Sequence, residues 1–310
     1  TSYAQKNKIF VYSKPSKQST PIKSYSIGSK LKFRAYNGDW FQAAVYVDGK
    51  KQSGYLYKKD VSINPPTING YAKKKLAIYK SASRNAKKLK TYPSGSKLKF
   101  KPYNSSWYQA AIFIKGKAVK GFIHKNDVTL YKITVADQLK TIDENNQLIL
   151  VTTKGYNTYK ATIRTFERTA SGNWKQILSV PGYIGKNGFA RNKKEGDGKS
   201  PAGKYTIGFA FGQKGNPGTK LPFRAITNDD VWVDDPESKL YNTWQSRKKA
   251  SGQWKSAENM NNKLYRYGFV INYNQERIPY KGSAIFFHVA NNYTLGCTGT
   301  SEKYVVSILK

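Results

Sequence analysis

The first 128 residues alternate between apolar and polar positions in short runs. Residues 30–33 read Lys-Leu-Lys-Phe, and residues 108–113 continue a similar pattern over a longer stretch. A period of two is typical of β-strands with one buried face. Turn residues at Asn37-Gly38, Asp48-Gly49 and 115–117 separate the runs. The pattern predicts short strands that fold into small barrels.

The same region contains an internal duplication. Its matched segments are 28–33 with 95–100, 40–44 with 107–111, 54–56 with 121–123, and 60–61 with 127–128. All matched residues lie 67 positions apart, a regularity that chance does not explain. We predict two copies of one module, residues 1–63 and 71–129, joined by a short and fairly stiff linker that contains two prolines.

A different pattern begins after the second copy and defines a third domain, residues 135–310. Residues 147–153 and 158–168 have strand patterns, and turns marked by glycine or proline follow at short intervals. Two segments predict helices: residues 235–244 and residues 301–309, the second of which follows hydroxyl residues that can cap it. The whole chain is therefore predicted to be mainly β with few short helices.

The charge of the chain points to anionic surroundings. It has 54 lysines and arginines against 18 acidic residues, a formal charge of +36. Lysine predominates, and its mobile point charge suits diffuse polyanions, whereas arginine reads phosphates and guanine edges bidentately. No nucleic-acid-binding motif is present, so sequence-specific nucleic-acid recognition is disfavoured. We expect a basic surface that faces anionic polymers such as those of a bacterial wall; the alternative is a charge that serves solubility alone.

The chain of 310 residues has one cysteine, Cys297. This excludes an intramolecular disulfide and any multi-cysteine metal site. No stretch approaches the ~20 apolar residues that span a bilayer, and no charged-then-apolar leader opens the chain. A mature secreted protein without its signal peptide would look the same. We expect no transmembrane segment, no metal and no cofactor.

The strongest candidate chemistry involves Cys297 and a histidine. An apolar run ends at His288, and Cys297 follows nine residues later among glycine and threonine. A free thiol has a pKa of ~8.5, so a nearby imidazole or helix N-terminus is needed to raise its thiolate fraction. A helix from Ser301 would begin just after the cysteine. Gly296 lets the backbone N–H groups of 296–298 face a developing oxyanion. These features predict a cysteine acyl-transfer site.

Two segments carry a resemblance to a known family. His288 followed by residues 294–298 (TLGCT) resembles the signature of the L,D-transpeptidase (YkuD-like) family of peptidoglycan cross-linking enzymes, a histidine followed by Ser/Thr-x-Gly-Cys. Upstream, residues 195–205 (EGDGKSPAGKY) resemble the family's Asp-Gly-x-Thr/Ser-Pro-x-Gly turn and strand. The resemblance covers about residues 135–310, with both segments in the expected order.

The resemblance implies a role for each matched residue. Cys297 is the nucleophile and His288 its general base and later acid, oriented by a backbone carbonyl as is frequent in the family. The backbone around Gly296, supported by Thr294 and Thr298, forms the oxyanion hole. In this family the cysteine attacks the carbonyl that joins a diamino acid to D-alanine and passes the acyl group to the amine of a neighbouring peptide stem. Carbapenem inhibitors are expected to acylate Cys297.

The duplicated modules resemble bacterial SH3-like domains. In these domains a tryptophan strand, here at Trp40 and Trp107, is followed by a Gly-aromatic strand, here Gly54-Tyr55 and Gly121-Phe122. The resemblance implies a non-catalytic binder of wall or peptide, and the alternative is a pair of spacers that bind nothing. His124 occupies the position of the second repeat that corresponds to Tyr57 of the first. This exchange favours a surface residue over a ligand.

Two features depart from the family's pattern. Many members have an arginine two residues after the cysteine, and Gly299 stands there in this chain. The sequence ends at Lys310, soon after the predicted helix, where the resemblance implies a further strand. Further candidates for a substrate cleft, with core packing as the alternative, are Trp232, Tyr241, Tyr267 and Asn272.

The sequence thus predicts a secreted, wall-associated L,D-transpeptidase whose partners are peptidoglycan stem peptides and anionic wall polymers. Two alternatives stay open. An L,D-carboxypeptidase, which uses water as the acceptor, would need the same site residues. A catalytically silent wall-binding protein would have kept only the fold of the third domain.

Overall fold

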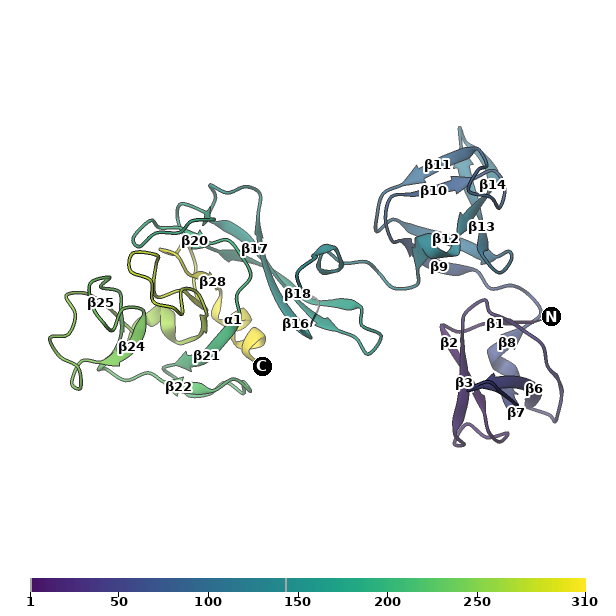
Figure 1. The fold of residues 1–310 in the computed structure, drawn as a ribbon, viewed down its shortest axis with the longest axis horizontal. Coiled ribbons are helices and arrows are strands. Elements are labelled where there is room, and N and C mark those ends of the chain that lie inside the picture. The colour runs from purple at the N-terminus through teal and green to yellow at the C-terminus, as the bar shows by residue number, and fades with distance from the viewer. Residues whose placement is uncertain (1, 143) are drawn as a thin grey trace. The chain divides into compact units, whose positions relative to one another are not determined.

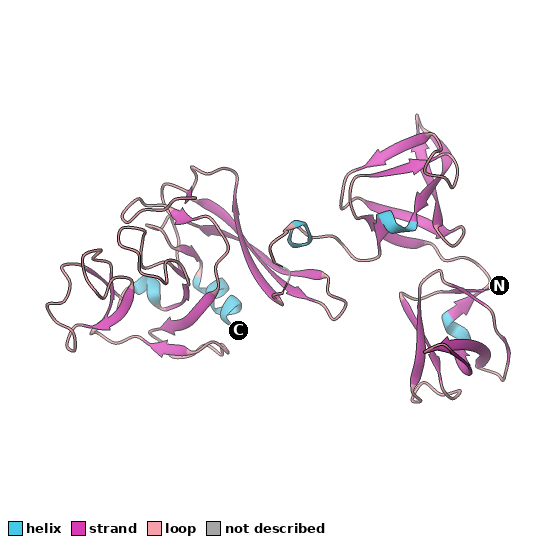
Figure 2. Cartoon of the chain, in the orientation of Figure 1, coloured by secondary structure: helices cyan, strands magenta, loops and turns pink. Residues whose placement is uncertain are grey.

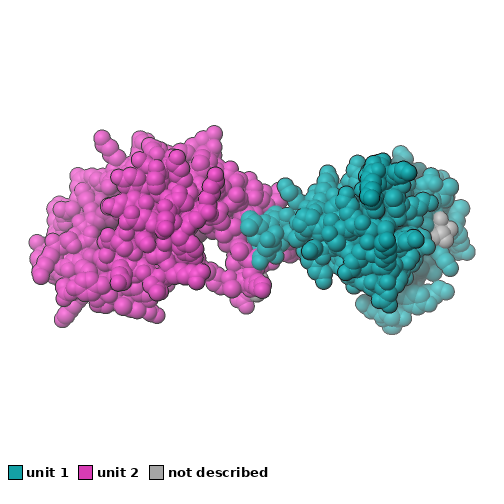
Figure 3. Space-filling model, turned by 90° about the horizontal axis from the view of Figure 1, so that it is seen from above, with its two compact units in different colours: residues 1–138 teal, residues 139–310 magenta. Residues whose placement is uncertain are grey.

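The computed structural model describes residues 2–142 and 144–310 and divides into two compact units, residues 1–138 and 139–310 (Figure 3). Strands dominate both units (Figure 2), so the predicted mainly-β class is confirmed. Within the described residues the strands form open sheets, and no sheet closes into the barrels that the sequence predicts. Each unit is described by itself.

The first repeat of unit 1 has two sheets, with strand orders β4-β1-β8 and β3-β2-β7-β6-β5 (Figure 1). Its elements are β1 (Ser2–Ala4), β2 (Lys8–Tyr12), β3 (Pro21–Ser26), β4 (Lys30–Leu31), β5 (Arg34–Ala35), β6 (Trp40–Val47), β7 (Lys50–Tyr57), the 3-10 turn η1 (Lys58–Asp60) and β8 (Val61–Ser62).

The second repeat forms one seven-stranded sheet in the order β11-β10-β14-β13-β12-β9-β15. Its elements are β9 (Ile68–Ala72), β10 (Leu76–Tyr79), β11 (Lys88–Tyr92), β12 (Lys97–Pro102), β13 (Trp107–Ile114), β14 (Lys117–His124), η2 (Lys125–Asp127), β15 (Val128–Thr129) and, beyond it, η3 (Ala136–Gln138).

A tight hairpin recurs in both repeats. Strand β6 pairs with β7 from Trp40↔Tyr57 to Val47↔Lys50, and β13 pairs with β14 in the equivalent register. The two-residue turns Asp48-Gly49 and Lys115-Gly116 have positive φ at both positions. That backbone matches the twist of a hairpin and favours glycine in the second place. The turns predicted from the sequence at these positions are confirmed.

Unit 2 is built on an eight-stranded sheet with the order β16-β17-β18-β28-β27-β26-β21-β22, beside a three-stranded sheet β24-β23-β25 and the pair β19-β20. Its elements are β16 (Gln147–Thr153), β17 (Lys160–Arg168), β18 (Trp174–Tyr183), β19 (Phe189–Ala190), β20 (Ser200–Pro201), β21 (Ile207–Gly212), β22 (Phe223–Ala225), β23 (Asp230–Val233), β24 (Thr243–Ser246), β25 (Ala257–Asn259), η4 (Lys263–Tyr265), β26 (Tyr267–Ile271), β27 (Phe286–Val289), β28 (Thr298–Thr300) and α1 (Glu302–Leu309).

The large sheet has a different core on each face. Phe287 and Val289 of β27 pack with Val305 of α1 in one cluster. Phe286, which points the other way because side chains alternate along a strand, packs with Trp232 in a second cluster that also contains the cysteine. Helix α1 therefore covers the face opposite to the predicted site.

One of the two predicted helices is wrong. The helix over residues 301–309 exists as α1, with Ser301 as its N-cap residue. Residues 235–244 instead form turns that lead into β24. The Asp235 carboxylate accepts the backbone N–H groups of Glu237 and Lys255, at 3.0 and 2.8 Å, and this local alternative competes with a helix.

We expect Gly54→Ala to destabilise the first repeat by about 1–3 kcal/mol. A Cβ at this position would lie 2.3 Å from Cγ1 of Val11, a stiff and buried side chain. Denaturant unfolding of the full chain measures the effect. Gly38→Ala is the matched control because a Cβ there meets no atom within 4 Å. Equal stability of the two variants would contradict the packing described for Gly54.

Candidate functional site

The two segments that resemble the L,D-transpeptidase signatures meet at one serine. The Ser200 hydroxyl lies 2.6 Å from the carbonyl oxygen of Gly296 and 3.0 Å from that of Cys297. The same oxygen accepts the backbone N–H of Gly185 at 3.0 Å. Residues about 100 positions apart in the sequence are thus held together, and Ser200 fixes the turn that presents the cysteine.

Cys297 precedes strand β28, with 7% of its surface exposed. Its Sγ donates to the Ala284 carbonyl at 3.2 Å and accepts the Phe286 N–H at 3.3 Å. Burial raises the pKa of the thiol, and the charge of Glu258 adds to this, whereas the Phe286 N–H and the Lys193 charge lower it. The net effect is a raised pKa, so this conformation holds a neutral thiol.

His288 lies in strand β27, is 3% exposed, and projects from the same face as Phe286. Its Nδ1 is 2.8 Å from the Val289 carbonyl, a backbone group of the kind expected to orient it. Burial lowers the pKa of His288 to about 4, against the opposing effect of hydrogen bonds with the backbone of Val289 and Leu264. The imidazole is therefore unprotonated at neutral pH.

The thiol and the imidazole are neighbours on one face without a direct hydrogen bond among the described residues. The parallel register of β27 and β28 places His288 beside Gly299 and Phe287 beside Thr298. The sulfur of Cys297 instead contacts the backbone at Phe286, two residues before the histidine, which corresponds to about 7 Å along a strand. A proton transfer between the two groups needs a local shift.

The predicted support residues form a closed turn. The Thr294 hydroxyl donates to the Cys297 carbonyl at 2.6 Å and accepts the Gly296 N–H at 3.2 Å. Thr298 is buried at the start of β28. The Gly296 amide is thus engaged within the turn, so it would have to exchange this partner before it could stabilise an oxyanion.

The helix dipole does not act on the thiol as the sequence predicts. Helix α1 begins at Glu302, after strand β28, and covers the opposite face of the sheet. The dipole effect falls off within one turn of a helix end. The expected lowering of the Cys297 pKa is therefore absent, and burial controls its protonation instead.

Lys193 is a site residue that the sequence reasoning missed. Only 3% of its side chain is exposed. Its Nζ donates to Asp197 at 2.8 Å and to the Lys194 carbonyl at 3.2 Å. Its Cε would lie 3.6 Å from a Cβ on Gly296. An acidic residue four positions later in the upstream signature is the cue that could have revealed this buried cation.

A buried acid and a tyrosine complete the surroundings of the thiol. The Tyr265 hydroxyl donates to Glu258, and its ring stands edge-on to His288 with centroids 5.0 Å apart. Burial raises the pKa of Glu258 to about 7, the Tyr265 hydrogen bond opposes this, and the charges of Asp234 and Glu195 add to it. Glu258 is the residue here whose charge changes near neutral pH.

Two of the predicted cleft residues lie near the site. Trp232 packs against Phe286 with centroids 4.9 Å apart, and its Nε1 donates to Asn242 at 2.8 Å. Tyr241 is buried, donates to Glu195 and accepts the Gly282 N–H at 3.0 Å. Both side chains support the segment that carries the Ala284 carbonyl, and neither lines an open cleft in this conformation.

The other two cleft candidates lie elsewhere. Tyr267 alternates with Gly268 along β26 and packs in the cluster on the α1 face, away from the cysteine. Asn272 donates through Nδ2 to the Thr206 hydroxyl at 2.9 Å. Strand alternation directs Tyr267 to the core on the α1 face and Asn272 bonds to Thr206, so the structure does not bring these two residues to the cysteine.

Unit 1 carries a duplicated aromatic surface. Tyr36 and Tyr55 make an edge-on pair with centroids 4.8 Å apart, and Tyr103 and Phe122 make the same pair at 4.8 Å. The interplanar angles are 68° and 70°. Tyr36 and Tyr103 are 49% and 47% exposed, so burial does not explain why both repeats keep them. We name these two pairs the aromatic notches.

A stacked pair under a lysine accompanies each notch. Phe41 stacks on Phe33 in the first repeat, with ring centroids 4.2 Å apart. Tyr108 stacks on Phe100 in the second repeat, with centroids 4.3 Å apart. Lys58 Nζ lies 5.1 Å from the Phe41 ring centroid, and Lys125 Nζ lies 5.2 Å from that of Tyr108. Both repeats thus combine exposed aromatic rings with positive charge.

His124 has a structural partner in the second repeat. Its Nδ1 accepts the Asn126 N–H at 3.2 Å and so caps the η2 turn. Its ring also stands edge-on to Trp107 at 5.1 Å.

Two kinds of feature are absent from the described part of the chain. No group of three or more His, Cys, Asp and Glu side chains there is placed to hold a metal ion. No helix found in the described residues is long and apolar enough to cross a membrane.

Comparisons with known proteins give only distant likenesses. No protein-family model matches the chain, and no curated protein matches it in sequence. A similar solved structure is NlpC2 from Trichomonas vaginalis, with 14% identity and a TM-score of 0.20 over 43% of this chain and 48% of that one. NlpC1 from the same organism shares 11% identity at a TM-score of 0.20 over 57% and 87%.

The native structure of CBDP35 shares 14% identity at a TM-score of 0.17 over 42% of this chain and 95% of that one. The likeness to NlpC2 covers 48% of that structure, so this chain spans less than half of it. Likenesses at these TM-scores carry no argument, so the site stands on its own residues and geometry.

We expect Lys193→Met to destabilise unit 2 by about 2–4 kcal/mol at pH 7, because it leaves a mostly buried carboxylate unpaired. Burial raises the pKa of Asp197, but hydrogen bonds from Lys193 and from the Lys194 and Lys199 amides outweigh it, and the pKa is lowered. The pair therefore stabilises the fold above the ordinary carboxyl pKa of 3.8, and its contribution is lost as pH falls through the lowered value.

Thermal or denaturant unfolding at pH 7 and pH 3 measures this difference. Lys194→Met, which removes the exposed neighbour, is the control and should change the free energy of unfolding by less than about 0.5 kcal/mol. A Lys193→Met penalty that is as large at pH 3 as at pH 7 would show that packing, not the ion pair, is what was lost.

Proposed function

We propose that this protein is a secreted, wall-associated cysteine acyltransferase of the L,D-transpeptidase type, which acts on peptidoglycan stem peptides. One observation carries the proposal. The single cysteine of the chain lies in a turn that the upstream signature holds through Ser200, on the same sheet face as the buried His288. The +36 charge suits an anionic wall.

The proposed reaction has two steps. In the first, the Cys297 thiol gives its proton to His288, the sulfur forms a thioester with the carbonyl that precedes D-alanine, and D-alanine leaves with that proton on its amine. In the second, the amine of a neighbouring stem attacks the thioester, loses a proton to His288, and the proton returns to the sulfur. Burial lowers the pKa of His288 to about 4, so the imidazole starts unprotonated but is a weak base until the site opens and its desolvation is relieved.

The described conformation is a resting one in this scheme. The sulfur donates to the Ala284 carbonyl, and Trp232, Trp244 and Met260 from around the three-stranded sheet pack in the same cluster as Cys297. A substrate carbonyl can reach the sulfur only if this covering segment moves. The same movement would let the thiol exchange Ala284 for His288.

A second candidate is a silent wall-binding protein. The raised thiol pKa and the absence of a thiol–imidazole hydrogen bond among the described residues favour it. An L,D-carboxypeptidase that uses water as the acceptor shares every site residue, so analysis of the reaction products separates it from a transpeptidase.

We expect incubation with a carbapenem to give a covalent adduct on Cys297 that intact-protein mass spectrometry detects. Cys297→Ala should give none, and His288→Gln should slow acylation by about 10²–10⁴-fold because the base is lost. His124→Gln is the matched control, since His124 is the other histidine of the chain and lies in unit 1. A wild-type protein that forms no adduct and releases no D-alanine from stem peptides would falsify the enzymatic proposal and favour the silent binder.

We expect the aromatic notches to hold the protein on the wall. Tyr36→Ala combined with Tyr103→Ala should weaken binding to purified sacculi at least about tenfold, because each variant removes an exposed ring from one of two sites. Co-sedimentation with sacculi measures the binding. Tyr46→Ala with Phe113→Ala is the matched pair, exposed at equivalent positions outside the notches. Loss of binding in this second pair alone would contradict the assignment.

A further inference from the structure

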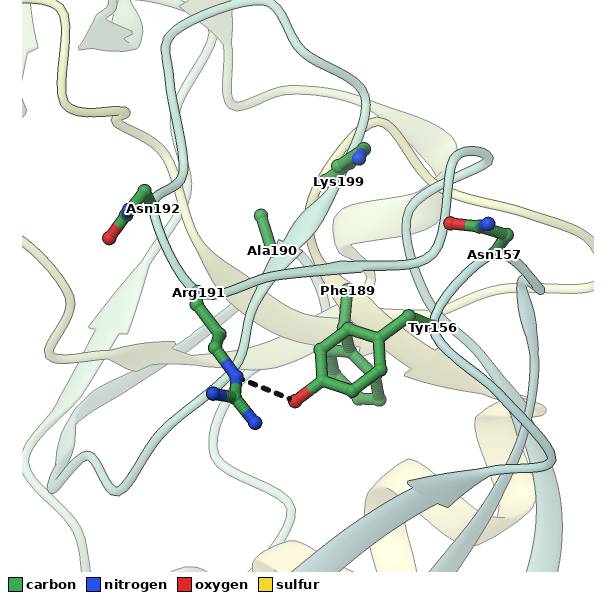
Figure 4. A pocket seen from close by; sticks show the side chains of 7 residues that line it. All are labelled: Tyr156, Asn157, Phe189, Ala190, Arg191, Asn192 and Lys199. Atoms are coloured by element: carbon green, nitrogen blue, oxygen red, sulfur yellow. Dashed lines mark hydrogen bonds between the residues drawn. The ribbon is translucent and has the colours of Figure 1, made fainter.

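Unit 2 contains a cavity of about 450 Å³ beside the upstream signature (Figure 4). Its lining comes from the loop between β16 and β17, from β19 and the residues after it, and from the residue before β20; these are Tyr156, Asn157, Phe189, Ala190, Arg191, Asn192 and Lys199. The cavity lies close to the cysteine turn, since a Cβ on Gly296 would be 3.2 Å from the Lys199 carbonyl. The acyl-transfer scheme uses none of the residues that line it.

Backbone hydrogen bonds hold the cavity walls in place. The Phe189 N–H donates to the Tyr156 carbonyl at 2.9 Å, and the Ala202 N–H donates to the Ala190 carbonyl at 2.8 Å. Gly188 has a φ of +82°, and a Cβ there would lie 1.7 Å from the Tyr156 carbonyl oxygen. The loop and strand β19 thus approach as closely as a glycine permits, and the cavity is preformed.

Arg191 presents a positioned and unused cation at this cavity. Its Nε donates to the Tyr156 hydroxyl at 3.2 Å, and its guanidinium carbon lies 5.8 Å from the Tyr156 ring centroid (Figure 4). Tyr156 is the partner that the structure gives the Arg191 side chain, and among the described residues neither terminal nitrogen has a hydrogen bond or ion pair. One side of the guanidinium is therefore fixed, and the planar fork is free to bind an oxyanion bidentately.

The nearby carboxylates do not neutralise the cavity. Asp197 accepts hydrogen bonds from Lys193 Nζ and from the Lys199 amide, and Glu195 accepts the Tyr241 hydroxyl. The Lys199 side chain lines the cavity together with the Arg191 cation and two asparagine amides. The cavity lining therefore offers positive charge and neutral donors. Asp197 of the adjoining turn is paired with a cation, and Glu195, which keeps its charge, is not part of the lining.

We propose that this cavity binds a phosphate ester carried on a sugar or polyol. The Arg191 fork takes two phosphate oxygens, and Lys199 supplies a second positive charge. A carboxylate would be satisfied by the arginine alone, whereas a phosphate has further oxygens for the lysine and the amides. The volume exceeds that of a bare phosphate, and Tyr156 and Phe189 give an apolar wall for the attached group.

This inference does not depend on the proposed acyltransferase activity, because binding needs no thiol. Isothermal titration calorimetry of the full-length chain at constant ionic strength tests it, with glycerol 3-phosphate, inorganic phosphate and acetate as probes. We expect saturable binding of glycerol 3-phosphate at one site, weaker binding of inorganic phosphate, and the weakest of acetate. Cys297→Ser should bind like the wild type.

Arg191→Gln should weaken glycerol 3-phosphate binding at least about tenfold, because a bidentate charge-assisted contact is lost. Arg247→Gln is the matched control, since it removes one equally exposed positive charge from unit 2 away from the cavity. Tyr156→Phe, which keeps the ring and releases Nε, should have an intermediate effect. Circular dichroism melting confirms that each variant folds.

Four results would overturn the inference. Equal weakening by Arg191→Gln and Arg247→Gln would show a diffuse effect of net charge, and an absence of saturable binding would show that the cavity takes no phosphate. Acetate binding as tight as that of glycerol 3-phosphate would indicate a carboxylate site. Inorganic phosphate binding as tight as that of the ester would remove the assigned role of the aromatic wall.

Discussion

The buried hydroxyl of Ser200 is the contact on which the site depends. It accepts the Gly185 N–H, and its one proton is shared between the carbonyls of Gly296 and Cys297, so it contacts three buried backbone groups from two distant segments. Each such group left without a partner costs about 1–3 kcal/mol. The position of Cys297 is therefore set by a polar contact across the fold, and the turn around Thr294 only completes it.

Burial orders the cysteine and at the same time suppresses its reactivity. The environment that holds the sulfur between Ala284 and Phe286 also raises its pKa and keeps His288 neutral. A nucleophile needs the opposite, a polar partner for the thiolate. Lys193 lies near enough to lower the pKa of the thiol but is itself paired with Asp197. The proposed activity would thus require a second arrangement of the same residues, with the carbonyl of Ala284 exchanged for a better acceptor.

Local patterns predicted the parts of the fold that local interactions determine. The hairpins follow from Asp48-Gly49 and its repeat, and the last helix was predicted from the hydroxyl residues before it, of which Ser301 is the N-cap residue. For the candidate site, the sequence indicated which residues to consider but not how they lie relative to one another. The acidic residue four positions after Lys193 hints at an ion pair, but the burial of Lys193 and the face of Tyr267 both depend on tertiary packing. The expected helix over residues 235–244 failed because an aspartate turn competed with it.

The two repeats of unit 1 show which side chains can change between copies and which stay the same. Asp60 and Asp127 are buried equivalents that pair with cations at different positions, Lys6 in one repeat and Arg84 in the other. The fold therefore tolerates a change of partner where only a charge must be satisfied. The aromatic notches differ, because their exposed rings keep the same separation and angle in both copies. Tyr36 and Tyr103 stay about half exposed in both copies, so their retention fits the proposed role of the notches in binding the wall.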